Sequence, residues 1–176
     1  MPIAEEDSKA QLRSIQSFLG VSSLPDEHHE KLEGSCRWID EREDFKNWRD
    51  APYMVDFGQE IDSSPLIYWV NASPGAGKTV LAAYVSSQLK GFGLHHAVYY
   101  FHVGKKASQS LAGFLRSIAF QMTTSNTAIR DAITKLQNEG ISFDLDDARA
   151  VWSKIFKGGI LPVRSLHLLG LLFYLI

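Results

Sequence analysis

The sequence has a single cysteine, no surplus of charge of either sign and no apolar run long enough to cross a membrane. Cys36 therefore has no second cysteine with which to form an internal disulfide. Lys and Arg number 18 against 20 Asp and Glu, a net charge of -2, so no basic excess indicates a nucleic-acid partner. The first ten residues are polar and acidic, whereas a signal peptide starts basic and continues apolar. These absences favour a cytoplasmic protein with neither nucleic acid nor membrane as its partner.

What is present is ordinary for a globular chain, with 45% apolar and 22% charged residues in a length of 176. Near the N-terminus, apolar residues recur at spacings of three and four, which predicts an amphipathic helix from Glu5 to Leu19. Gly20 ends this helix, and the polar, turn-rich stretch that follows predicts a linker. The apolar residues of the predicted helix are Leu12, Ile15, Phe18 and Leu19.

The charged stretch GSCRWIDEREDFKNWRD, residues 34–50, contains four isolated large apolar residues. Such a pattern predicts short helices that dock their aromatic side chains onto a larger body. The four residues are Trp38, Ile39, Phe45 and Trp48.

The middle of the chain alternates between apolar runs typical of buried strands and segments with helical periodicity. This order predicts an α/β fold with a parallel sheet and right-handed crossovers. Together with the phosphate-binding loop pattern at residues 72–79, it predicts a three-layer parallel sheet of the P-loop NTPase class. Strands are predicted at 66–70 and 97–103, and helices at 78–89, 108–122, 126–138 and from near Asp144, where Asp146 and Asp147 suit a helix start.

The sharpest motif is ASPGAGKT, residues 72–79, between a predicted strand and a predicted helix. This is the phosphate-binding loop pattern, with Ala72 where the commonest form has glycine. Gly75 and Gly77 let the backbone turn its N–H groups toward phosphate oxygens. Lys78 would bind the β- and γ-phosphates, and the Thr79 hydroxyl would bind Mg²⁺. The sequence therefore predicts a site for ATP or GTP with Mg²⁺, formed by Pro74, Gly75, Ala76, Gly77, Lys78, Thr79 and Val80, with Thr79 as metal ligand.

Residues 34–162 resemble a known family. The docking segment, LIYWVNASPGAGKTVLAAYVSSQL, AVYYFHV and LAGFLRSIAFQM follow one another as in the NACHT-type P-loop domains of fungal STAND proteins, also described as nephrocystin-3-like N-terminal domains. The resemblance implies a nucleotide-operated switch between an effector domain and C-terminal repeats. It divides the chain into a helix and linker (1–33), an incomplete NACHT-like domain (34–163) and an apolar tail (164–176).

The acidic strand that P-loop NTPases use to hold Mg²⁺ and position water is not apparent. ISFDLDD, residues 141–147, fits a helix start better, and where the family continues with an acidic strand this chain reads RSLHLLGLLFYLI. We expect residues from about Arg164 onward to derive from a shifted or intron-derived reading frame; a replacement core strand or helix, or a spanning helix, are the alternatives. Weak nucleotide binding with negligible hydrolysis is expected, and no catalytic residue is assigned.

Two other functions stay open at this point. A small-molecule or nucleotide kinase shares the loop, and a non-catalytic fragment could self-associate, or pair with full-length STAND relatives, through the helix from Glu5 to Leu19. Lys105 and Lys106 could reach a phosphate, although a solvated loop is the simpler interpretation. The pairs His28–His29 and His95–His96 have no matching ligand spacing, so no metal site is expected there.

Overall fold

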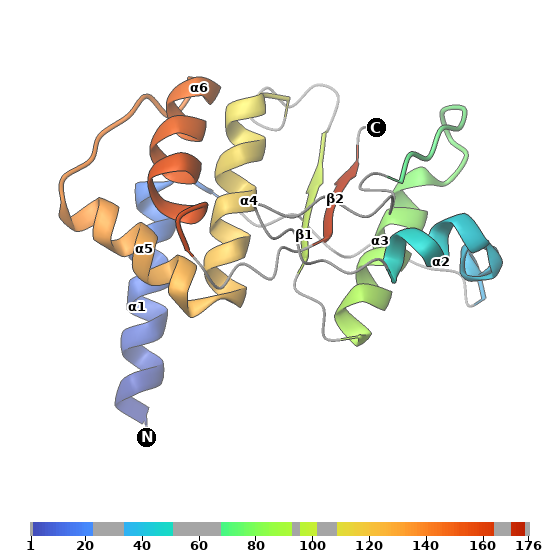
Figure 1. Ribbon diagram of the computed structural model, residues 1–176, viewed down its shortest axis with the longest axis horizontal. Helices are drawn as coiled ribbons and strands as arrows, with labels where there is room; N and C mark the ends of the chain where they lie inside the picture. The colour runs from blue at the N-terminus through green and yellow to red at the C-terminus, as the bar shows by residue number, and fades with distance from the viewer. Residues whose placement is uncertain are drawn as a thin grey trace.

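The computed structural model describes residues 2–22, 34–50, 68–92, 96–101, 109–163 and 170–174. Two parallel strands lie between two groups of helices (Figure 1). The elements in chain order are α1 (Pro2–Phe18), the 3₁₀-helix η1 (Arg37–Glu41), α2 (Glu43–Arg49), α3 (Lys78–Gly91), β1 (His96–Tyr100), α4 (Leu111–Ser125), α5 (Thr127–Asn138), α6 (Ala148–Val151), the π-helix η3 (Trp152–Ile160) and β2 (Gly170–Tyr174).

The predicted three-layer parallel sheet of the P-loop NTPase class is wrong for this structure. The described residues are mostly helical, and their strands are only β1 and β2, paired from His96↔Gly170 to Tyr100↔Tyr174. The strand predicted at 66–70 is absent from its described part, residues 68–70. A buried central strand needs strands and helices on all sides, and Trp69 is instead 75% exposed.

β1 separates two hydrophobic cores. Its side chains alternate, so that Ala97 and Tyr99 join one cluster while Val98 and Tyr100 join the other. We call the first the helical core, formed with α1, α4, α5, α6 and η3, and the second the loop-side core, formed with η1, α2 and α3. The predicted strand at 97–103 is thereby confirmed for the residues of β1, and 102–103 lie outside the described residues.

The N-terminal helix belongs to the helical core. As predicted, α1 ends before Gly20, whose φ of 60° suits glycine. Ile15 and Leu19 are completely buried, and Gln11 Nε2 donates to Thr134 Oγ1 of α5 at 3.0 Å. The boundary at residue 33 stays a prediction, but the helix ahead of it packs against α4 and α5 (Figure 1).

The segment 34–50 docks as predicted, with one exception. Ile39, Phe45 and Trp48 are buried in the loop-side core against α3. The Phe45 ring also meets Tyr68 edge-on, with 5.5 Å between centroids. Trp38 is 54% exposed, so its predicted docking was wrong; it precedes Ile39, whose side chain takes the inward position.

Capping side chains set the starts of the later helices. The Ser110 hydroxyl accepts from Gly113 N, so α4 begins three residues after the predicted start at 108. Asn126 Oδ1 accepts from the amides of residues 128 and 129 at the predicted start of α5. Asp147 caps α6, as its predicted place at a helix start implied, and residues 141–147 form no strand.

The tail predicted at 164–176 contains β2, which lies beside β1 in parallel register. The structure therefore has a strand within the tail, and the origin of the tail stays a prediction. In the part of the chain that the structure describes, no helix combines the length and apolarity needed to cross a membrane.

Candidate functional site

The glycine-rich loop lies open to solvent ahead of α3. Residues 71–77 are exposed, while the helix that follows buries Leu81 and Ala82 in the loop-side core. Gly75 and Gly77 have φ angles of 80° and 82°, a backbone conformation that residues with a Cβ avoid. A Cβ added at either glycine would meet no atom of the described residues within 4 Å. Among these residues, the backbone turn and not crowding therefore requires glycine at both positions.

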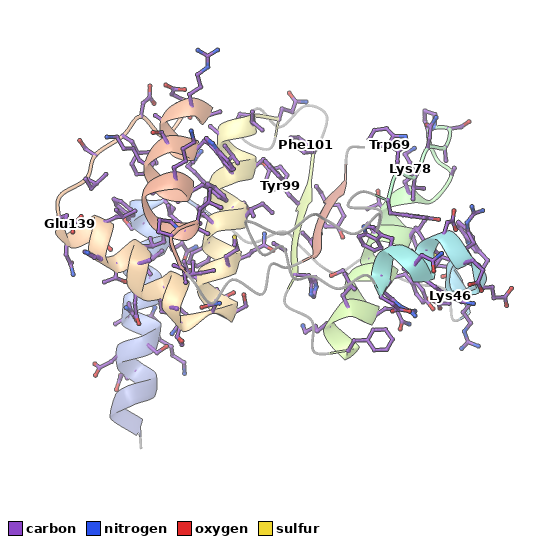
Figure 2. All side chains as sticks on the ribbon, in the orientation of Figure 1. Lys46, Trp69, Lys78, Tyr99, Phe101 and Glu139 are labelled. Carbon is purple, nitrogen blue, oxygen red and sulfur yellow. The ribbon has the colours of Figure 1, made fainter. Side chains whose placement is uncertain are left out.

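Lys78, the first residue of α3, closes the loop on itself (Figure 2). Its Nζ donates to the carbonyl oxygens of Ala72 at 2.9 Å and Ser73 at 3.0 Å. An ammonium group has three N–H donors, so two hold the loop and a third is left for an anion. The lysine thus joins the two ends of the motif and brings a positive charge to its open side.

The start of α3 has no capping side chain. Its N-cap is Gly77, and the amide of Leu81 is the first to bond back to the Gly77 carbonyl, at 2.9 Å. The amides of Lys78, Thr79 and Val80 therefore have no acceptor within the helix. Together with the positive end of the helix dipole, these groups suit an anion with several oxygens.

The protein could supply only some of the ligands of a Mg²⁺ ion at this site. Thr79 is half-buried at the second residue of α3, in position to offer one hydroxyl oxygen. Within the described ranges, no group of three or more His, Cys, Asp or Glu side chains could hold a metal ion. Mg²⁺ in proteins combines one or two carboxylates with phosphate oxygens and water. The residues present therefore fit a Mg²⁺ ion that is bound mainly by the phosphates of a nucleotide.

A hydrogen bond connects α3 to the docking segment behind the loop. The Tyr84 hydroxyl donates to the Asp40 carboxylate of η1. This bond, followed by burial, raises the pKa of Tyr84 above its ordinary value. With the packing of Ile39 and Phe45, it anchors the helix whose first turn forms the site.

The sequence did not single out Trp69 or the Ser86–His96 pair, whose Oγ and Nε2 lie 2.9 Å apart. Trp69 belongs to the run 66–70 that was predicted to be a buried strand, and nothing in that run marked its indole as exposed. All seven predicted site residues, 74–80, are described and lie together at the start of α3. The predictions for Lys105, Lys106, His28, His29 and His95 lie outside the described residues.

Comparison with known proteins gives one match. A family model described as nephrocystin 3, N-terminal, matches residues 34–168, which include the docking segment, the loop, and the elements from α3 to η3. Neither the curated proteins nor the solved structures contain a significant match to the chain.

Proposed function

The chain belongs to the nephrocystin 3 N-terminal family, and from this premise we propose that residues 74–80 bind the phosphates of ATP or GTP with Mg²⁺. The resemblance to NACHT-type domains of fungal STAND proteins supplies the role: a nucleotide-binding module whose conformation carries a signal. The wider protein's effector, repeats and trigger are not part of this proposal.

The observation that carries the proposal is the combination found at the start of α3. Two glycines with positive φ, three amides without helical acceptors and the Lys78 ammonium meet at the exposed loop. A triphosphate offers the many oxygens that such donors need, and its charge is favoured by the helix dipole. In a turn with a purely structural role, we would expect the amides and the ammonium group to be bonded within the chain.

Binding without appreciable hydrolysis is the expected behaviour. P-loop NTPases position the attacking water and Mg²⁺ with a carboxylate at the end of a strand. β2, the strand that lies beside β1, has the sequence GLLFY and carries no acid. Thr79 and the nucleotide itself would therefore hold the ion, and no described group is placed to activate water.

A kinase is not favoured, because two of the four arginines that follow the loop stabilise helix ends in the helical core. Arg116 Nη1 donates to the carbonyls of Leu19 at 3.0 Å and Gly20 at 2.7 Å. Arg130 Nε donates to the Thr123 carbonyl at 3.0 Å. Self-association through the predicted helix from Glu5 to Leu19 is not favoured either, because Ile15 and Leu19 are already covered within the chain.

Calorimetric titration of the full chain with MgATP and MgGTP tests the proposal. Lys78→Ala should weaken both by at least about tenfold, because charge-assisted bonds to phosphate are lost. Lys46→Ala is the matched control, since Lys46 lies on α2 (Figure 2) and its Nζ pairs with Glu43 at 2.8 Å on the protein surface. Equal affinities for the wild type and Lys78→Ala would refute the site, and turnover near 1 s⁻¹, on the order of working enzymes, would refute the absence of hydrolysis.

A further inference from the structure

One large aromatic side chain stands exposed immediately ahead of the phosphate loop. Trp69 is 75% exposed, the largest exposure among the described large apolar residues. Its neighbours Tyr68 and Val70 are half-buried and pack against the loop-side core. Tyr68 is held by the rings of Phe45 and Trp48, at centroid distances of 5.5 and 5.9 Å. Two anchored neighbours therefore keep the indole pointing outward.

Other exposed aromatic residues contact a ring or a guanidinium, or belong to elements that do not adjoin the loop in sequence. Trp152 stacks on Phe156 in η3, with centroids 5.0 Å apart, and the Arg49 guanidinium lies 5.3 Å from the centre of the Phe92 ring. Trp38 belongs to η1. Trp69 makes no ring contact with another residue of the described ranges, so a flat apolar surface of the indole is available.

Trp69 is also close to the phosphate site along the chain. It precedes Ala72, whose carbonyl accepts from Lys78, by three residues, so their Cα atoms are separated by about 11 Å at most. Figure 2 shows the Trp69 and Lys78 side chains at the same end of the molecule, at the start of α3. A nucleotide with its phosphates over residues 75–79 would have its base within reach of this indole.

We propose that Trp69 is the platform on which the base of the bound nucleotide stacks; this inference rests on the proposed triphosphate site. Stacking on an aromatic face is possible for every base, and it reads no hydrogen-bonding edge. The site should therefore accept ATP and GTP with similar affinity and bind CTP more weakly, because a pyrimidine offers a smaller surface to the indole. The class of ligand is a purine nucleoside triphosphate selected by stacking.

The test compares nucleotides with inorganic tripolyphosphate, which carries the charge but no base. Full-length wild type, Trp69→Ala, Trp69→Phe, Trp38→Ala and Lys78→Ala are titrated by calorimetry with the magnesium complexes of ATP, GTP, CTP and tripolyphosphate. Trp69→Ala should weaken ATP and GTP by about tenfold and leave tripolyphosphate unchanged, since one base stack is lost. Trp69→Phe should restore most of the affinity. Trp38→Ala, which removes another exposed indole from the same side of β1, should behave as wild type.

The outcomes separate this inference from the function on which it rests. Lys78→Ala should weaken all four ligands, and a loss of tripolyphosphate binding in that variant supports the triphosphate site whatever Trp69 does. Unchanged ATP affinity in Trp69→Ala would overturn the stacking role alone. An equal loss of affinity for tripolyphosphate in Trp69→Ala would also overturn the stacking role, because the substitution would then act on the phosphate loop and not on the base. If the wild type bound none of the four ligands, both proposals would fall.

Discussion

The helices on the two sides of β1 differ in whether a side chain caps their first amides. On the side of the helical core, α4, α5 and α6 each begin with a side chain that accepts from the first amides: Ser110, Asn126 and Asp147. On the loop side, α3 begins at Gly77 with no side-chain cap. Capping stabilises a helix by satisfying amides that would otherwise have no partner. The first amides of α4, α5 and α6 thus have side-chain acceptors within the chain, whereas the first amides of α3 have no side-chain cap.

The two cores differ in size as well. Among the described residues, sixteen buried side chains belong to the helical core and nine to the loop-side core. Since buried apolar area supplies most of the stabilisation, we expect the helical core to dominate the free energy of unfolding. The loop-side core has the smaller task of positioning α3 and the loop.

The largest expected effect separates stability from binding. Ile133 of α5 is completely buried in the helical core, and Ile133→Ala should lower the free energy of unfolding by about 2–5 kcal/mol through lost burial and a residual cavity. Triphosphate affinity of the folded protein should stay unchanged, because α5 belongs to the helical core and α3 to the loop-side core, on opposite sides of β1 (Figure 1). Urea denaturation and calorimetry below the transition measure the two. Ile133→Val is the milder control, at about 0.5–1.5 kcal/mol; a parallel fall in affinity would show that the two sides are not separable.

The next effect concerns the strand that the two sides share. The Gln121 side-chain amide of α4 bonds to both main-chain groups of Val98, accepting from its N at 2.9 Å and donating to its carbonyl at 2.8 Å. Val98 is only 3% exposed, so Gln121→Leu leaves buried polar groups without a partner and should cost about 1–3 kcal/mol. Hydrogen exchange at the Val98 amide should accelerate. Gln137→Leu removes an exposed hydrogen bond to Ser14 and should change neither the free energy of unfolding nor the exchange rate. An unchanged exchange rate in Gln121→Leu would show that Gln121 does not hold β1 in solution.

Two changes of similar cost should distinguish the helix starts. Asn126→Ala removes the cap of α5 and should lower the free energy of unfolding by about 1 kcal/mol with no effect on triphosphate affinity. Gly77→Ala places a Cβ at a φ of 82°, with a strain of about 1–2 kcal/mol. Unlike Asn126→Ala, Gly77→Ala should also lower the affinity for the triphosphate, because the loop relaxes away from its turned conformation. Equal affinities in the two variants would remove the distinction between a capped and a ligand-binding helix start.

The helices were predictable because their signals are local. The spacing of Ile15 and Leu19 predicted α1, and Asn126 marked the start of α5. For α4, residues 108 and 110 are both serines, and the choice between them depends on which hydroxyl reaches an amide. The motif likewise predicted a glycine turn followed by a helix start, and residues 74–80 lie at the start of α3; that they bind a nucleotide stays a prediction.

What failed depends on partners that a local pattern does not contain. Residues 66–70 have the composition of a buried strand, but Trp69 is exposed and 68–70 pair with no described strand. Conversely, β2 lies in residues 164–176, where no strand was the preferred prediction; the foreign origin expected for that segment stays a prediction. A strand is defined by its neighbours, so apolar composition alone did not decide which run would pair with β1.

The smallest expected effect compares one tyrosine from each side of β1. Asp40 holds the pKa of Tyr84 above its ordinary value of 10.0 through a hydrogen bond, and burial does so for Tyr99. Because the folded-state pKa is raised in both, each contribution to stability is complete below pH 10 and is lost as the pH rises through the folded pKa. Tyr84→Phe should therefore cost a few tenths to about 1 kcal/mol near neutral pH, where the bond to Asp40 is intact, and it should reduce the loss of stability above pH 10.

Tyr99→Phe is the matched variant in the helical core. It should reduce the loss of stability above pH 10 too, because burial disfavours the ionised form of the phenol that the substitution removes. Urea unfolding at about pH 8 and pH 11 measures both, and a Tyr84→Phe variant with the wild-type pH dependence would show that the Asp40 bond does not hold α3 to η1 in solution.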